Sequence, residues 1–194
     1  MYRLPKLKGK GQIQHYPDKG YALRLEKEGY LELQGTESLD LFNGGTLTAT
    51  VRFSEPNLVA GKPATYDMII FKENEFLLGR TKDGLYFNLF IDGKWTVRAV
   101  NPALPSATWI HVAVTLTRTD KNYVASYYIN GKKVYETQIP MGKRLEEKRR
   151  PVLLGKGWGK VWLMKGDIAN VSIYNHPLSD AEIADLFRTV HYIE

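Results

Sequence analysis

Three tight-turn dipeptides constrain the fold of this chain more than any other feature. Asp83-Gly84, Asp92-Gly93 and Asn130-Gly131 each separate two runs of apolar or aromatic residues. A two-residue hairpin connection favours Asn, Asp and Gly, because these residues tolerate the positive φ angles that it requires. The three dipeptides therefore predict β-hairpins, and with them an antiparallel sheet in which successive strands pair.

Short strand candidates occur along the rest of the chain. In residues 46–53, Leu47, Ala49, Val51 and Phe53 fall on one face and threonines fall on the other, which indicates a strand with one buried face. A series of short strands without alternating helices is typical of a β-sandwich. The predicted strands are 21–25, 30–34, 46–53, 68–72, 75–80, 85–91, 94–100, 110–117, 123–129, 133–138, 152–155 and 167–174.

One helix is predicted, close to the C-terminus. Ser179 and Glu182 have the spacing of a capping box, in which each side chain bonds the other residue's backbone N–H. Apolar residues at helical spacing follow at Ile183, Leu186 and Phe187. We therefore expect a short helix over residues 180–188.

Length and composition indicate one folded unit. A chain of 194 residues with 43% hydrophobic residues is long enough for one buried core and too short for two ordinary domains, so we expect a single domain. The chain has no cysteine, so the core is held without disulfides. No apolar run approaches the ~20 residues of a membrane-spanning helix, and residues 1–12 lack the apolar segment of a signal peptide.

The net charge of +6 favours polyanionic partners. Residues 143–150, KRLEEKRR, carry much of this charge, either as a solvated connection between strands or as a docking rim for an acidic polysaccharide. No nucleic-acid-binding motif accompanies the charge, so we expect no nucleic-acid partner.

Four segments together resemble one family. They are WIHVA (109–113), NGK (130–132), LLG (153–155) and the closing stretch GDIANVSIYN with LSDAEI (166–183). This set resembles the concanavalin A-like lectin/glucanase superfamily, in particular its laminin-G-like branch, from about residue 21 onward. The extent of the resemblance implies an N-terminal arm over residues 1–20 and a single laminin-G-like domain over residues 21–194. The resemblance implies an all-β fold, an antiparallel concanavalin A-like jelly-roll β-sandwich with one short C-terminal helix. It also implies an extracellular or cell-surface location, with any secretion signal outside this chain.

The family's calcium ligand is missing at one position. Where family members often carry an aspartate after the Ile of the closing stretch, this chain has Ala169, which offers no side-chain oxygen to a hard cation. We therefore predict no metal site and no cofactor. A calcium ion held with the help of backbone carbonyls stays open as an alternative.

An enzymatic function is the less favoured interpretation. Glucanases of this fold use carboxylates in the pattern E-x-D-x-x-E, and this pattern is absent. The closest pairs, Glu26 with Glu28 and Asp180 with Glu182, fit a solvated strand end and a helix cap. His111 lies in mid-strand and fits a structural histidine better than a catalytic one. The other histidines are His15, His176 and His191.

Aromatic residues supply the candidate binding site. The apolar C–H faces of sugars stack on Trp and Tyr rings, while Asn and Arg bind hydroxyl and carboxylate groups at the rim. No catalytic residue is assigned. The carbohydrate-binding candidates are Trp158, Trp95, Tyr86, Asn88, Arg98 and Trp162.

We therefore expect a non-catalytic module that binds a polysaccharide or glycan, with an acidic one included among the candidates. Two alternatives stay open. One is a laminin-G-like adhesion module that binds a protein partner, and the other is a divergent glycoside hydrolase or polysaccharide lyase with two convergent titratable groups in a cleft. Because many functions share this sandwich, the ligand is a separate question from the fold.

Overall fold

The structure is a computed structural model. It describes residues 5–17, 19–36, 39–54, 58–59, 62–63, 66–96, 99–100, 102–143, 150–159 and 162–191. The strands are β1 (Lys6–Tyr16), β2 (Gly20–Leu33), β3 (Gly45–Phe53), β4 (Leu58–Val59), β5 (Lys62–Pro63), β6 (Tyr66–Lys72), β7 (Phe76–Thr81), β8 (Gly84–Ile91), β9 (Lys94–Trp95), β10 (Ala99–Val100), β11 (Trp109–Arg118), β12 (Asn122–Ile129), β13 (Lys132–Pro140), β14 (Val152–Leu154) and β15 (Gly166–Tyr174). The helix is α1 (Asp180–His191).

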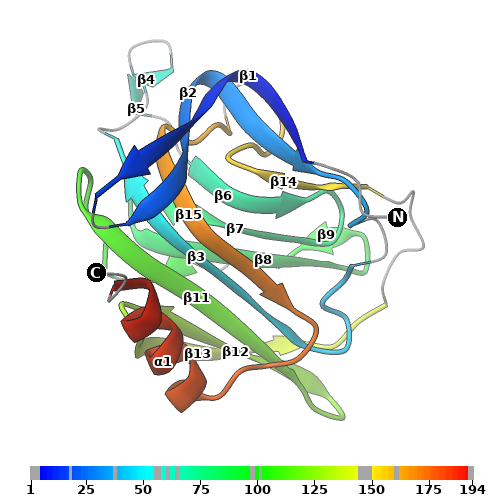
Figure 1. The fold of residues 1–194 in the computed structure, drawn as a ribbon. Helices are drawn as coiled ribbons and strands as arrows, with labels where there is room; N and C mark the ends of the chain where they lie inside the picture. The colour runs from blue at the N-terminus through cyan, green and yellow to red at the C-terminus, as the bar shows by residue number, and fades with distance from the viewer. Residues whose placement is uncertain are drawn as a thin grey trace.

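The main strands form two antiparallel layers (Figure 1). The first layer has the order β13, β12, β11, β3, β15 and the start of β2. The second layer has the order β10, β8, β7, β6, β14 and the end of β2, and β9 pairs with β8. This architecture confirms the predicted antiparallel β-sandwich.

Strand β2 belongs to both layers. Its residues 23–25 pair with residues 166–168 of β15, and its residues 31–33 pair with residues 152–154 of β14. The sequence suggested two separate strands here, at 21–25 and 30–34, but β2 is one strand that runs from Gly20 to Leu33 around a corner. Glu28 at the corner has a φ of 68°, and facing it the register of β1 shifts between Lys8 and Lys10, around Gly9.

Residues 1–20, which we expected to form an arm, contain β1. This strand pairs with β2 along its whole length, from Lys6 opposite Glu32 to Tyr16 opposite Gly20. The pattern of lysine, glycine and glutamine gives β1 little apolar periodicity, and most of its side chains are exposed. Pairing with β2 therefore rests on backbone hydrogen bonds more than on burial.

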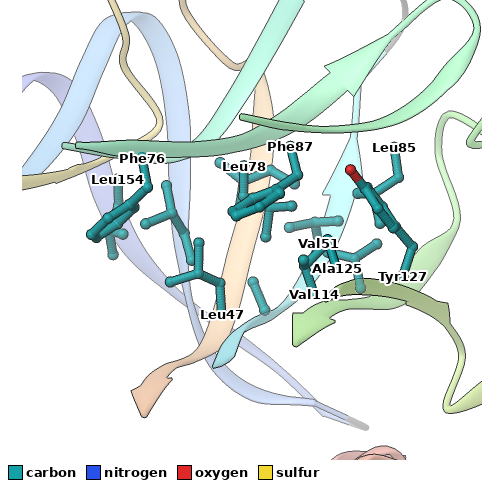
Figure 2. Close-up of a cluster of buried hydrophobic side chains, with 14 of the residues drawn as sticks. Leu47, Val51, Phe76, Leu78, Leu85, Phe87, Val114, Ala125, Tyr127 and Leu154 are labelled. Carbon is teal, nitrogen blue, oxygen red and sulfur yellow. The ribbon is translucent and has the colours of Figure 1, made fainter. Parts of the chain in front are cut away.

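The core lies between the layers, where their inner faces meet (Figure 2). Phe76, Leu78 and Phe87 of the second layer point toward Val51 and Val114 of the first, and each is 0–1% exposed. These residues sit at alternate positions of their strands, because neighbouring side chains of a strand point to opposite faces. The outer face of each layer is therefore available for other packing or for ligands.

The three predicted hairpins are all present. Asp92-Gly93 and Asn130-Gly131 have positive φ at both residues, as their sequence indicated. The first hairpin turns one residue earlier than expected: Thr81 pairs with Gly84, so Lys82 and Asp83 form the turn and Gly84 begins β8.

Helix α1 packs on the outer face of the first layer (Figure 1). Its Ile183 is fully buried against Ala113 of β11 and Tyr128 of β12. The predicted capping box is confirmed: the Ser179 N–H donates to Glu182 Oε2 at 2.8 Å, and the Glu182 N–H donates to Ser179 Oγ at 3.3 Å. The two hydrogen bonds that Ser179 makes to Glu182 lower the pKa of the Glu182 carboxyl.

We predict that Gly9→Ala destabilises the protein more than Gly35→Ala does. Both glycines have positive φ, which costs an alanine about 1–2 kcal/mol. A Cβ on Gly9 would lie 2.2 Å from the Glu28 carbonyl oxygen, whereas a Cβ on Gly35 would meet nothing within 4 Å. Urea unfolding should therefore show a further loss of about 1–3 kcal/mol for Gly9→Ala. Equal losses for the two variants would mean that β1 does not pack at the corner of β2.

Candidate functional site

The outer face of the second layer carries a connected group of aromatic rings, called here the aromatic surface. Alternation along β8 explains part of it, since Leu85, Phe87 and Leu89 enter the core while the residues between them face outward. Tyr86 and Phe71 are buried, and the remaining rings are partly buried. The aromatic surface consists of Tyr66, Phe71, Tyr86, Phe90, Trp95, Trp158 and Trp162.

Three tryptophans form the middle of the aromatic surface. The centroid of the Trp158 ring lies 5.0 Å from that of Trp95 and 5.2 Å from that of Trp162, with interplanar angles of 80° and 88°. Trp162 in turn stacks on Tyr66 at 3.9 Å with an angle of 4°. Edge-to-face and stacked pairs hold the rings at fixed orientations, because they match the quadrupoles of the rings.

The three tryptophans come from one hairpin and one loop. Trp95 follows the Asp92-Gly93 turn, which places it opposite Phe90 of β8. Trp158 and Trp162 lie in the loop after β14, where the Gly157 N–H donates to the Trp162 carbonyl at 2.7 Å. A Cβ on Gly157 would approach Trp162 to 3.1 Å, so a glycine at this position lets the loop fold down onto the sheet.

Asn88 is a buried amide at this face. It is 0% exposed, and among the residues that the structure describes neither its side-chain oxygen nor its nitrogen has a hydrogen-bond partner. The amide lies near enough to the Tyr86 hydroxyl to lower the pKa of that phenol, but outside hydrogen-bond geometry. Leaving a buried amide unpaired costs about 1–3 kcal/mol, so an unpaired Asn88 lowers the free energy of unfolding.

The Tyr86 hydroxyl keeps its proton at neutral pH. Burial raises the pKa of Tyr86, and the neighbouring Tyr66 raises it further. The phenol can therefore act as a hydrogen-bond donor or acceptor toward a neutral partner such as a hydroxyl group.

The structure brings five of the six sequence-predicted residues together. Trp95, Trp158, Trp162, Tyr86 and Asn88 all lie at the outer face of the second layer. Arg98 lies outside the described residues.

Sequence reasoning missed three members of the aromatic surface. Phe90 follows Asn88 by two residues and so shares its face, a signal that alternation alone could have supplied. Tyr66 and Phe71 lie on different sides of an irregularity in β6, where the register shifts between Met68 and Ile70, so simple alternation could not place both.

The carboxylate pairs considered for catalysis lie elsewhere. The Arg24 Nε–H donates to Glu26 Oε1 at 3.1 Å on β2. Asp180 accepts a hydrogen bond from the Tyr128 hydroxyl at 2.7 Å, and this bond is the main cause of the lowered pKa of Asp180. Both pairs thus have structural partners.

His111 is 1% exposed, and its Nε2 lies 2.6 Å from Thr48 Oγ1. This buried position on β11 matches the expected structural histidine better than a group that meets substrate. Ala169 is likewise buried in β15. In the part of the chain that the structure describes, no group of three or more His, Asp or Glu side chains is placed to hold a metal ion.

A family model described as the concanavalin A-like lectin/glucanases superfamily matches residues 25–184. No curated protein matches the chain by sequence. No helix among the described residues is long and apolar enough to cross a membrane.

Several solved structures share the fold. Domain 4 of AbnA, an extracellular arabinanase from Geobacillus stearothermophilus solved with arabinotriose, matches with a TM-score of 0.69 at 15% identity, over 95% of this chain and 88% of that one. The binding domain of Paraclostridial Mosquitocidal Protein 1 matches with a TM-score of 0.73 at 17% identity, over 96% of this chain and 47% of that one. The binding domain of botulinum neurotoxin serotype D/C matches with a TM-score of 0.69 at 17% identity, over 97% of this chain and 48% of that one. The chain thus spans about half the length of the two toxin domains, and identities this low show the fold alone.

We predict that Asn88→Leu leaves the free energy of unfolding unchanged or raises it by about 1 kcal/mol, because it removes an unpaired buried amide and keeps most of the volume. Asn88→Ala is the matched control, since it removes the amide and also leaves a gap, and it should lower stability. Urea unfolding midpoints measure both. A loss above about 2 kcal/mol in Asn88→Leu would show that the amide is hydrogen-bonded in the folded protein.

Proposed function

Because the chain belongs to the concanavalin A-like lectin/glucanases superfamily, we propose that it is a non-catalytic carbohydrate-binding module that holds a glycan on its aromatic surface. The observation that carries this proposal is the connected set Trp95, Trp158 and Trp162. Their rings are partly buried and so keep part of their surface exposed, on an outer face rather than in the core.

The chemistry of the aromatic surface suits a sugar chain. Indole and phenol rings present flat apolar faces, on which the C–H faces of successive sugar rings stack. The Tyr86 hydroxyl and the Asn88 amide supply hydrogen-bonding groups close to these faces, and a ligand hydroxyl that reached Asn88 would satisfy an amide that has no partner among the described residues. Arg98 is proposed as a polar contact at the rim.

Preformed geometry supports binding without covalent chemistry. The tryptophan rings hold one another at nearly right angles, so little side-chain freedom is left to lose when a ligand binds. No step of bond cleavage is assigned to the surface. We propose that binding proceeds without calcium.

Structural neighbours give the proposal a second line of support. The arabinanase domain was solved with arabinotriose, and cell entry of botulinum neurotoxin type C, which contains the same fold, depends on interaction with two ganglioside molecules. Glycan binding thus occurs in proteins that contain this fold. We propose an extracellular or cell-surface location for this chain on the same basis.

A protein-binding adhesion module is the second candidate. A neurotoxin binding domain of this fold was solved with rat synaptotagmin II, which is a protein partner. In this chain, Val134 and Tyr135 are exposed apolar residues on β13, at the edge of the first layer. A partner bound there would not need the aromatic surface.

We predict that Trp95→Ala and Trp158→Ala each weaken glycan binding at least about tenfold, which corresponds to about 1.4 kcal/mol. The test is a glycan array of neutral and acidic polysaccharides, followed by titration calorimetry on the best ligand, with calcium and with a chelator. Tyr135→Ala is the matched control, because it removes an exposed aromatic ring from the other layer and should change glycan affinity less than about twofold.

Thermal unfolding shows whether each variant is folded before its affinity is compared. If the array gives no ligand, or if the tryptophan variants bind as well as the parent protein, the aromatic surface is not a glycan site. Capture of a protein partner that is lost in Tyr135→Ala would support the adhesion module instead.

A further inference from the structure

A hollow lies on the outer face of the first layer, away from the aromatic surface. Arg24, Arg52 and Asp167 alternate with residues that enter the core, so their side chains leave the opposite face of β2, β3 and β15. The hollow has a volume of 270 Å³, close to the low end of small-molecule sites at about 300 Å³. Its lining residues are Arg24, Arg52, Phe53, Ser54, Ala107 and Asp167.

A buried carboxylate organises this hollow. Asp167 is 2% exposed and accepts hydrogen bonds from the Tyr16 hydroxyl at 2.6 Å and from Arg52 Nε at 3.0 Å. The Tyr16 oxygen in turn accepts from Arg52 Nη2 at 2.9 Å and from Arg24 Nη1 at 3.2 Å. The carboxylate is thus satisfied from within, and two arginines are brought to the same place.

Each arginine has a donor group to spare. Arg24 uses Nε toward Glu26 and Nη1 toward Tyr16, and Arg52 uses Nε and Nη2. Among the described residues, Arg24 Nη2 and Arg52 Nη1 have no hydrogen-bond acceptor. Both side chains are about one-third exposed, at 31% and 28%, and line the hollow. A ligand that carries an acceptor can therefore reach them.

Aromatic rings fix the position of Arg52. Its guanidinium carbon lies 4.7 Å from the centroid of the Tyr16 ring and 5.2 Å from that of the Trp109 ring. Cation–π contacts and the ion pair with Asp167 leave this guanidinium little freedom. A donor held this way loses little entropy when it binds an anion.

A smaller hollow adjoins the first. It has a volume of 220 Å³ and is lined by Lys10, Gly11, Gln12 and Glu26. The hydrogen bond of 3.1 Å between Arg24 and Glu26 joins the two hollows, because each of these residues lines one of them. The polar side chains of the smaller hollow suit hydroxyl groups.

We propose that the two hollows form a second binding site, which takes an acidic oligosaccharide with the carboxylate of one sugar residue between Arg24 and Arg52. Across both hollows, the cationic side chains of Arg24, Arg52 and Lys10 outnumber the carboxylates of Asp167 and Glu26 by one. A single ligand carboxylate balances this excess and accepts hydrogen bonds from the spare guanidinium donors, which are charge-assisted and stronger than neutral ones. The neighbouring sugar residue lies against Gln12 and Glu26.

This site does not depend on the aromatic surface. The two surfaces lie on outer faces of different layers, with the core between them. A loss of tryptophan rings in the second layer therefore leaves the arginines in place, and the two proposals can fail separately.

The test is titration of the full chain with trigalacturonate, an acidic probe, and with galactotriose, its neutral counterpart. We expect Arg24→Gln to weaken trigalacturonate binding at least tenfold and to leave the Trp95-dependent binding of other glycans unchanged. Arg24 is the residue of choice because Arg52→Gln would leave Asp167 buried without its main partner. Lys82→Gln is the matched control: it removes one charge from a side chain that is 85% exposed, and it should change the affinity less than twofold.

Three results would overturn the proposal: no binding of trigalacturonate, equal losses in Arg24→Gln and Lys82→Gln, or equal affinity for galactotriose. Monomeric galacturonate serves as a further arm, and binding as tight as that of the trimer would exclude a contribution from the smaller hollow. Trp95→Ala should bind trigalacturonate with unchanged affinity, and a loss in this variant would place the acidic ligand on the aromatic surface instead.

Discussion

The packing of two apolar inner faces against each other is the interaction on which the rest of this molecule depends. Phe76, Leu78 and Phe87 meet Val51 and Val114 across the core, and strand alternation then sends every second side chain outward. Because the inner faces form the main core, the outer faces can carry other groups. The aromatic surface occupies one of them, and the arginine-lined hollow and helix α1 occupy the other.

Both outer faces contain polar groups that are costly to bury. Asn88 is fully buried and has no side-chain hydrogen-bond partner in the described part of the chain, whereas Asp167 is buried but paired with arginine and tyrosine. The two cases differ in energy, because a satisfied carboxylate contributes to a rigid network while an unpaired amide only lowers stability. A ligand can use both features: the fixed positions of the groups around Asp167 and the unused hydrogen-bonding capacity of Asn88.

Short sequence patterns predicted the features that depend on neighbouring residues, namely turns, the helix cap and strand alternation. Dipeptide turns located the hairpins, and the spacing of Ser179 and Glu182 located the start of α1. Alternation placed Tyr86 and Asn88 on one face. The meeting of Trp95 with Trp158 could not be predicted in this way, since it depends on the pairing of β14 with β6 and on how the following loop folds back. Strand β1 was missed because lysine and glycine give no apolar period, and the corner at Glu28 hid the continuity of β2.

The shared strand β2 also limits the order in which the strands can pair during synthesis. Its partners, β14 and β15, are among the last strands of the chain, while β2 itself is among the first. During synthesis, a ribosome releases the hairpins of residues 66–91 and 109–140 well before either layer can gain the strand that joins it to the other. Until then β1 covers one edge of β2 while the other edge lacks both β14 and β15. This open edge makes the N-terminal region of the nascent chain the part most in need of protection from aggregation.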